Sequence, residues 1–220
     1  VCIYSIMIGK HMGYMPEELT SLGTGAILHD VGKCRIPVEI LTKPDALTEE
    51  EFSMMKLHTA YGRNIINSTQ GLNKHISNIA FQHHEKWDGS GYPMGLRGHQ
   101  IDEFSRIVTV SDIYDALTSN RVYKRRALPH EAADYIVSNS STLLDPQIAE
   151  VFVKNIAIYP LNTVVLLNTG EIGSVVEANK ENTSRPKISV ISRKEGPPVF
   201  QPYILDLMEH PALSIIDVLS

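Results

Sequence analysis

The sequence contains no long run of apolar residues and no excess of positive charge. A membrane-spanning helix needs roughly 18 or more consecutive apolar residues, whereas the apolar stretch at residues 1–8 (VCIYSIMI) is much shorter. That stretch also lacks the basic start and the small-residue cleavage site of a signal peptide. Against 20 Lys and Arg residues stand 25 Asp and Glu residues, which gives a net charge of −5. This balance argues against long DNA or RNA as a partner, since such partners need a broad basic face, but it leaves room for a small phosphate ligand.

Cysteine is scarce as well, with Cys2 and Cys34 the only two in the sequence. Two such residues do not indicate a disulfide framework, so we expect a reducing, cytoplasmic location. We expect both thiols to be small buried hydrophobic groups. The chain starts at Val1, within a helical pattern, and we therefore expect it to be one part of a longer, multidomain protein.

Apolar residues at helical spacing dominate the first 158 residues. Thr48, followed by three glutamates, is typical of a helix N-cap with an acidic first turn. Residues 36–43 and the Gly- and Pro-rich segment 88–98 are expected to be loops. The pattern predicts a mainly α fold, a helical bundle, with helices at 1–12, 17–29, 48–58, 59–67, 74–84, 103–120, 129–138 and 145–156.

The pattern changes after Tyr159 and Pro160 to short β-branched runs divided by turn signals. These runs predict strands at 163–167, 173–177, 187–191 and 204–207. We therefore predict two domains, a helical domain at 1–158 and a small C-terminal antiparallel β appendage at 161–220. The appendage shows no cluster of ligand residues, so we expect a structural or partner-binding extension, with homodimer formation one candidate role.

Six side chains on the predicted helices, or at their ends, are preferred ligands of first-row transition metals. Imidazole and carboxylate groups together suit iron, manganese or zinc. Six ligands exceed what one catalytic ion usually takes from a protein, whereas two ions about 3.5–4 Å apart, joined by a carboxylate, would use them all. We expect the other five histidines, at positions 11, 75, 99, 130 and 210, to be structural or surface residues. The six candidate ligands are His29, Asp30, His58, His83, His84 and Asp112.

Two of the candidate ligand pairs are adjacent in the sequence. Neighbours on a helix point about 100° apart, so His29 and Asp30 can reach different ions, and His83 and His84 can do the same. Asp30 is the natural bridge between two ions, because a carboxylate has two oxygens whereas an imidazole offers one nitrogen at a time. Taken alone, the His29–Asp30 pair fits a buried hydrogen-bonded couple equally well.

Two sequence motifs resemble those of a known family. Residues 29–33 (HDVGK) resemble the HDxGK signature of the HD phosphohydrolase superfamily. Residues 83–93 (HHEKWDGSGYP) resemble the HHExxDGxGYP signature of its HD-GYP branch. The resemblance extends over most of the first 155 residues and includes segments 36–37, 43–44, 47–48, 55–58 and 111–119.

The resemblance implies roles for individual residues. Members of this branch hydrolyse cyclic di-GMP, a bacterial second messenger, at a centre of two or three divalent metal ions, with iron or manganese expected. By motif, the six candidate ligands would hold the metals, Lys33 would favour the phosphate or the attacking water, and Tyr92 would face the ligand. Arg121 and Lys124 resemble the basic residues that grip the ligand phosphates, and Asp115 would contact a guanine edge or orient one of the metal-ligating residues.

The function implied is a metal-dependent phosphodiesterase acting on a cyclic dinucleotide. A hydroxide generated by the metal ions would attack phosphorus in line, while Lys33 and the ions at Asp30 neutralise the developing charge. The expected product is pGpG, followed by GMP after a second cut. The alternative is a catalytically impaired module that binds cyclic di-GMP, or a diguanylate cyclase (GGDEF) partner, as a sensor.

One ligand of the family pattern has no counterpart in the sequence. HD enzymes have a further histidine upstream of the HD pair, and its position would fall before Val1. Either the parent protein carries that histidine upstream, or it lacks it and the domain is a degenerate sensor. The otherwise intact ligand set favours the first explanation.

Overall fold

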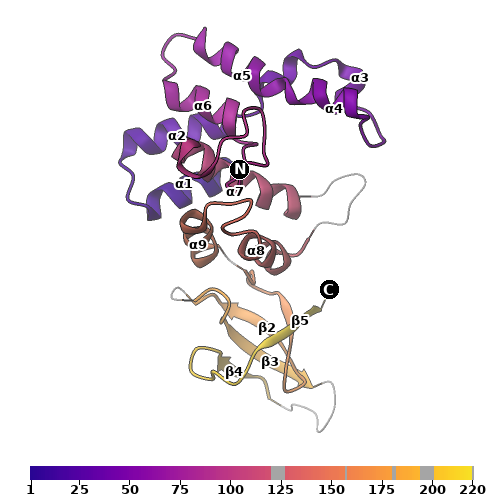
Figure 1. Ribbon diagram of the computed structural model, residues 1–220. Coiled ribbons are helices and arrows are strands. Elements are labelled where there is room, and N and C mark those ends of the chain that lie inside the picture. Colours follow the sequence, from indigo (N-terminus) through magenta and orange to yellow (C-terminus); the bar gives the residue numbers. More distant parts are fainter. Residues whose placement is uncertain (120–126, 157, 180–181, 194–200, 220) are drawn as a thin grey trace. The chain divides into compact units, whose positions relative to one another are not determined.

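The structure, a computed structural model, describes residues 1–119, 127–156, 158–179, 182–193 and 201–219. It is mainly α-helical and ends in an antiparallel sheet, which confirms the predicted fold class (Figure 1). The helices are α1 (Cys2–His11), α2 (Pro16–Leu28), the 3-10 helix η1 (Val31–Arg35), α3 (Val38–Leu41), α4 (Glu49–Lys56), α5 (His58–Asn67), α6 (Lys74–Gln82), the 3-10 helix η2 (Gly98–Gln100), α7 (Glu103–Thr118), α8 (Pro129–Ser138) and α9 (Pro146–Asn155). The strands are β1 (Val164–Leu167), β2 (Glu171–Glu177), β3 (Lys187–Arg193), β4 (Tyr203–Asp206) and β5 (Ile215–Leu219).

Several helices begin at side chains that satisfy the free backbone N–H groups of a first turn. At α4, the Thr48 hydroxyl accepts a hydrogen bond from the N–H of Glu51, and the Glu51 carboxylate accepts one from the N–H of Thr48. The side chains of Asn73 and Asp102 accept hydrogen bonds from the first turns of α6 and α7 in the same way. These caps place the starts of the helices that carry or support the candidate ligands.

Helix α7 is buried along much of its length, from Phe104 to Ser111 and again at Tyr114. It packs against α1 and α6. Ile107, Val108 and Val110 lie on different faces of the helix and all are fully buried. Because α7 is buried on several faces, it forms the central helix of unit 1, and it carries Asp112 on its second half.

A buried ion pair joins α7 to the start of α9. The guanidinium of Arg106 donates to the carboxylate of Asp145, and both residues are buried. The other oxygen of Asp145 accepts hydrogen bonds from the first turn of α9. Arg106 also donates to the carbonyl of Ile101 and lies 5.6 Å from the ring centroid of Trp87. This network fixes the segment that follows α6 against the helices.

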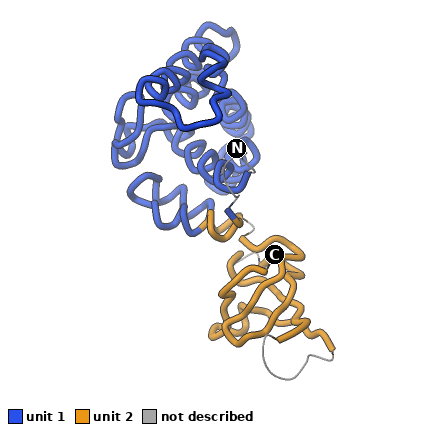
Figure 2. The backbone as a smooth tube through the Cα atoms, turned by 90° about the vertical axis from the view of Figure 1, so that its right-hand side faces the viewer, with its two compact units in different colours: residues 1–127, 134–152 blue, residues 128–133, 153–220 orange. Residues whose placement is uncertain are grey.

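The chain divides into two compact units, coloured separately in Figure 2. Unit 1 comprises residues 1–127 and 134–152, and unit 2 comprises residues 128–133 and 153–220. The sheet of unit 2 has the strand order β4-β3-β2-β1-β5, and neighbouring strands run antiparallel. One face of the sheet buries an aliphatic core of Val165, Leu167, Val175, Ile188, Val190, Leu205 and Leu207.

Three predictions from the sequence were wrong. Residues 36–43, predicted as a loop, contain α3, because the carbonyl of Pro37 accepts hydrogen bonds from the N–H groups of Ile40 and Leu41. Strand β5 was not predicted, and it is held by pairing with the distant β1. The thiol of Cys34 is exposed and that of Cys2 only partly buried, so neither is the buried group that was expected.

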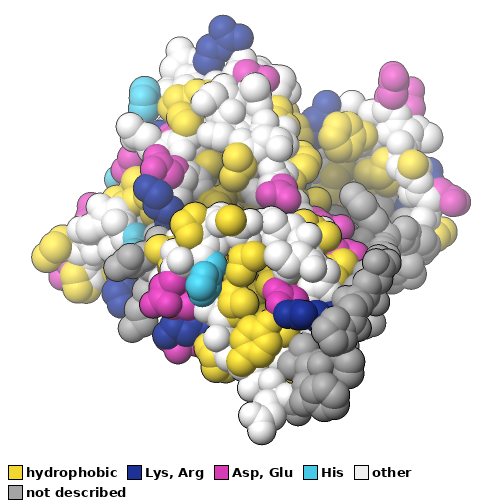
Figure 3. Space-filling view, turned by 90° about the horizontal axis from the view of Figure 1, so that it is seen from below, with side chains coloured by type: hydrophobic (Ala, Val, Ile, Leu, Met, Phe, Trp, Pro, Cys, Tyr) yellow, Lys and Arg dark blue, Asp and Glu magenta, His cyan; other side chains and the backbone are white. Residues whose placement is uncertain are grey.

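The face shown in Figure 3 carries charged side chains of both signs. In the view of Figure 3, acidic, basic and apolar side chains are interspersed, and the residues described there form no broad basic face. Within the described ranges, no helix has both the length and the apolar character needed to cross a bilayer.

Candidate metal centre

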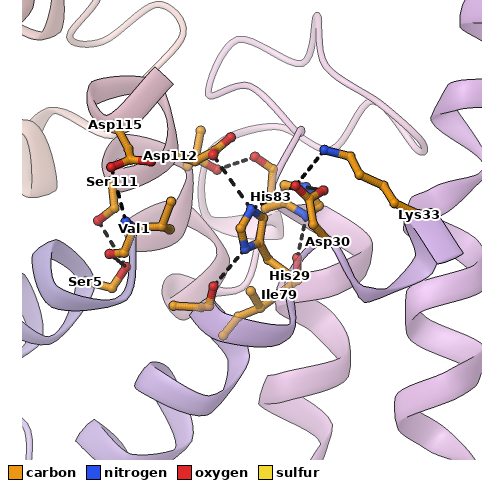
Figure 4. Close-up of polar contacts among 12 residues, drawn as sticks. Val1, Ser5, His29, Asp30, Lys33, Ile79, His83, Ser111, Asp112 and Asp115 are labelled. Carbon is orange, nitrogen blue, oxygen red and sulfur yellow. Dashed lines mark hydrogen bonds and ion pairs between the residues drawn. The ribbon is translucent and has the colours of Figure 1, made fainter. Parts of the chain in front are cut away.

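The six candidate ligands lie within unit 1, at the ends of three helices and on α7. Figure 4 labels His29, Asp30, His83 and Asp112 among them. His29 follows α2, Asp30 precedes η1, His58 begins α5, and His83 and His84 follow α6. One ligand atom from each of Asp30, His58, His83 and His84 lies within 4.8 Å of the others. The Nε2 atom of His29 lies 3.3 Å from Asp30 Oδ2 and 3.7 Å from Asp112 Oδ1, so all six side chains face a shared centre.

Gly32 explains how η1 comes so close to α5. A Cβ atom at this position would lie 1.9 Å from the carbonyl oxygen of His58 and 2.4 Å from the backbone nitrogen of Gly62. Only a glycine avoids this collision with backbone atoms. The close approach brings Asp30 and Lys33, on either side of Gly32, against His58.

Backbone carbonyls fix the orientation of three of the imidazoles. The Nδ1 atoms of His29, His58 and His83 lie 2.7, 2.7 and 3.0 Å from carbonyl oxygens of the preceding helical turns. A carbonyl can only accept, so each Nδ1 carries a proton and donates it. In the neutral ring this leaves Nε2 with a free lone pair. All three Nε2 atoms are turned toward Asp30, which is how metal-ligating histidines are usually held.

The lone pairs of His58 and His83 meet without a donor between them. The Nε2 atoms of His58 and His83 are 3.4 Å apart. They lie 3.4 and 3.8 Å from Asp30 Oδ1, a buried oxygen with no hydrogen-bond partner. Buried acceptors that face each other are unfavourable unless a positive charge lies among them. The donor set therefore fits one or more divalent cations.

Three of the histidines favour the neutral form that a metal ligand requires. Burial lowers the pKa of His58, and burial together with the nearby His84 and His29 lowers that of His83 well below its usual value. Burial and the nearby His58 lower the pKa of His84 to about 4. These rings therefore offer lone pairs rather than protons at neutral pH.

His29 and Asp30 show that the same place favours positive charge. Burial alone would lower the pKa of His29, but its contacts with Asp112 and Asp30 raise it to about 9. Burial alone would raise the pKa of Asp30, but His29 and Lys33 hold it well below its usual range. The carboxylates thus stay ionised and attract a cation.

The two oxygens of Asp30 face different partners. Oδ1 is directed at His58 and His83, whereas Oδ2 lies 3.3 Å from His29 Nε2 and 2.6 Å from Lys33 Nζ. The Lys33 ammonium thus lies at the rim of the centre, and its side chain is 42% exposed (Figure 4). This geometry is compatible with a carboxylate between two ions, and it leaves Lys33 able to reach a ligand from solvent.

Tyr92 lies beside the centre. Its ring centroid is 4.7 Å from that of His84, with the planes tilted by 30°. Burial and the negative charges of Asp30 and Asp112 raise its pKa above the usual value, so the hydroxyl stays protonated.

Asp115 lies one turn after Asp112 on α7, and its carboxylate is 3.6 Å from the backbone nitrogen of Val1 (Figure 4). It does not contact the six candidate ligands in the described structure. Arg121 and Lys124 fall outside the described residues, so their predicted contacts with ligand phosphates stay predictions.

Comparison with known proteins shows that the HD domain family matches residues 3–148 of this chain. The chain belongs to the HD domain family. Its eleven-residue HHEKWDGSGYP motif places this HD domain in the HD-GYP branch, as the resemblance implied. A second family, described as a KOW domain associated with the HD domain, matches residues 164–220, which include the whole sheet. No motif in the sequence predicted that second match.

Curated relatives of this HD domain include several cyclic dinucleotide phosphodiesterases. It is 33% identical over 190 residues to a cyclic di-GMP phosphodiesterase of Pseudomonas aeruginosa, covering 86% of this chain and 46% of the relative. It is 43% identical over 148 residues to a cyclic di-GMP phosphodiesterase of Thermotoga maritima, covering 67% and 40%. A 3'3'-cGAMP-specific phosphodiesterase of Vibrio cholerae is 34% identical over 156 residues, covering 70% and 30%. The chain thus spans less than half the length of these relatives.

Solved structures support the fold. An HD-GYP-type protein of Bdellovibrio bacteriovorus superposes with a TM-score of 0.56 at 24% identity, covering 69% of this chain and 48% of that chain.

Glu85 directly follows the ligand pair His83 and His84 in the sequence. The structure shows it buried, accepting hydrogen bonds from the N–H groups of Met94 (2.7 Å) and Leu96 (3.0 Å). Glu85 thereby closes the loop that carries Tyr92. Gly91 completes this closure, because a Cβ there would lie 2.5 Å from the carbonyl oxygen of His84. The signal for this role is an acid directly after the ligand pair and before a Gly- and Pro-rich loop.

Four of the five histidines predicted to be structural make side-chain contacts of their own. His75 pairs with Asp102 at 3.0 Å, and His99 packs on Trp87. His11 bonds to a carbonyl of its own helix, and His130 stacks on Tyr159.

Proposed function

We propose that this chain is the phosphodiesterase domain of a protein that hydrolyses cyclic di-GMP, or a closely related cyclic dinucleotide, at a centre of divalent metal ions. Linear pGpG is the proposed first product, and GMP follows from a second cut. Iron or manganese, two or three ions, is the proposed content of the centre. The names of the curated relatives support the substrate class.

One observation carries the proposal. Three imidazole Nε2 atoms with fixed tautomers and an unpartnered oxygen of Asp30 meet inside unit 1, where they match the ligand preferences of transition metals. When bound, such ions activate water for attack on phosphorus and neutralise charge on the phosphoryl oxygens.

The chain's own residues supply orientation and charge. One oxygen of Asp30 faces His58 and His83, and its other oxygen faces His29. This arrangement would suit Asp30 to hold two metal ions. Lys33 reaches the rim of the centre with its ammonium, where it would bind a phosphoryl oxygen of the substrate and stabilise its growing negative charge. Its hydrogen bond to Asp30 holds the ammonium in that position before substrate binds.

Hydrolysis of cyclic di-GMP tests the proposal. The full-length protein, loaded with Mn²⁺ or Fe²⁺, is compared with its Asp30→Ala and Asp45→Ala variants by chromatography of the products. Asp45 is exposed and serves as a matched control. We expect Asp30→Ala to lose at least about 100-fold in turnover, since removing even a supporting group of a metal site typically costs 10–100-fold.

Three outcomes would count against the proposal. Turnover retained in Asp30→Ala would remove the bridging role, and an equal loss in Asp45→Ala would show a non-specific effect. Tight binding of cyclic di-GMP without metal-dependent turnover in the unaltered protein would favour a sensor instead.

A further inference from the structure

Beside the metal centre, an aromatic surface continues outward from His84 onto α4. Tyr92 packs against His84, and Phe52 of α4 meets Tyr92 edge to face, with ring centroids 6.1 Å apart. Phe52 is 45% exposed, although an aromatic side chain is normally among the more buried residue types. An aromatic surface therefore extends from a candidate metal ligand to solvent, and the ring of Phe52 at its outer end stands nearly perpendicular to that of Tyr92.

Lys56 adds a positive charge to this surface. It lies one turn after Phe52 on α4, and its Nζ atom is 5.0 Å from the ring centroid of Phe52 and 5.9 Å from that of Tyr92. Such distances are typical of cation–π contacts. Among the parts of the chain that the structure describes, no carboxylate forms an ion pair with Lys56. Its ammonium is thus positioned by the rings while its N–H groups remain able to bind a ligand.

We propose that Phe52, Lys56 and Tyr92 form a purine-binding shelf that takes one base of the cyclic dinucleotide and favours guanine over adenine. This inference rests on the proposed function and names the part of the site that selects the base. An aromatic side chain can stack with any base, whereas the ammonium reads its edge. Guanine presents two acceptors, N7 and O6, on one edge, whereas adenine places an amino donor beside N7. A lysine ammonium can only donate, so it favours guanine.

The shelf is tested with substrates that differ only in their bases. The full-length, Mn²⁺-loaded protein is assayed with cyclic di-GMP, cyclic di-AMP and bis(4-nitrophenyl) phosphate, which has no base and reports on the metal centre alone. Phe52→Leu removes the ring but keeps apolar volume, and Lys56→Met removes the charge but keeps the stem. Lys10→Met, an exposed lysine of α1, is the matched control.

We expect Phe52→Leu to lower kcat/KM about 5- to 100-fold for both cyclic dinucleotides, mainly through KM, because stacking is lost. Lys56→Met should lower the preference for cyclic di-GMP over cyclic di-AMP about 10-fold. Hydrolysis of bis(4-nitrophenyl) phosphate should change less than about twofold in either variant. Equal losses on this substrate would show a structural effect on the centre, and an unchanged base preference in Lys56→Met would overturn the guanine assignment.

Binding measurements separate this inference from the proposed function. If the unaltered protein turns over neither cyclic dinucleotide, calorimetry with cyclic di-GMP and cyclic di-AMP gives the base preference directly. Guanine preference that disappears in Lys56→Met would keep the shelf while the phosphodiesterase proposal fails. Turnover whose base preference is the same in Lys56→Met and in the unaltered protein would keep the phosphodiesterase proposal and overturn the shelf. If the protein binds neither nucleotide, both proposals are contradicted.

Discussion

The two compact units bury different kinds of side chain. Unit 1 buries His29, His58, His83, Glu85 and Arg106 among its apolar residues, and it leaves an oxygen of Asp30 without a partner. Unit 2 buries an aliphatic core, and among its described residues the one buried charged side chain is Glu171. Glu171 is fully paired, by Tyr203, Thr169 and Arg193.

This difference locates the candidate ligand site in unit 1. Buried polar groups cost free energy unless they are satisfied, so an unsatisfied buried carboxylate among bare imidazole nitrogens points to a ligand. Unit 2 has no comparable group among its described residues. Substitutions that change one unit at a time can test this contrast.

The largest effect on stability is expected from the buried ion pair of unit 1. Arg106→Met leaves the buried carboxylate of Asp145 without its cation and should cost about 3–5 kcal/mol in the free energy of unfolding. Trp87, the single tryptophan of the chain, lies beside Arg106 and reports this transition by fluorescence. Arg63→Met, which removes an exposed cation–π contact with Phe81, should cost less than about 1 kcal/mol. Similar losses in the two variants would contradict the role of the buried pair.

A smaller effect is expected in the core of unit 2. Ile188→Ala should destabilise that unit by about 2–5 kcal/mol, because Ile188 is fully buried in the aliphatic core. Hydrogen exchange of the strand amides measures the loss, and the transition of Trp87 should be unchanged. Ile191→Ala on the same strand, 47% exposed, should stay within about 0.5 kcal/mol. A shift of the Trp87 transition in Ile188→Ala would show that the units unfold as one.

The smallest effect is the pH dependence of unit 2. The hydroxyl of Tyr203, followed by Thr169 and Arg193, lowers the pKa of Glu171 below its usual value of 4.5. A lowered pKa stabilises the fold above the unfolded-state value, and this contribution is lost as the pH falls through the folded-state value. The opening free energy of the strand amides, obtained from hydrogen exchange corrected for the intrinsic rate at each pH, should therefore fall more steeply below about pH 4.5 in the unaltered protein than in Glu171→Gln. Glu177→Gln on the same strand is the control. Equal pH dependence of strand stability in Glu171→Gln and in the unaltered protein would contradict this prediction.

Much of the fold was predictable because its signals are local. Caps such as Thr48 and Asn73 and the helical spacing of apolar residues place most helices within a few residues of their observed ends. Strand β5 was missed because its pairing with β1 joins residues about fifty positions apart, a contact with no local signal. Helix α3 was missed because a single turn that follows a proline resembles a loop in sequence.

The candidate site was predictable from its ligand types and motifs, but its supporting contacts were not. The fixed imidazole tautomers depend on carbonyls of particular helical turns. The hydrogen bonds from the loop to the Glu85 carboxylate depend on how that loop folds back. Phe52 and Lys56 did leave a signal, since residues four apart share a helix face. Their position beside Tyr92 depends on tertiary packing, which the sequence does not show.

Measurement of bound metal tests the proposed metal centre most directly. Full-length protein and its Asp30→Ala variant are loaded anaerobically with Fe²⁺ or with Mn²⁺, desalted, and analysed for bound metal by mass spectrometry. We expect about two ions per chain in the unaltered protein and less than one in the variant. Equal metal content in the two proteins, or none in either, would contradict a metal centre at Asp30 and its surrounding histidines.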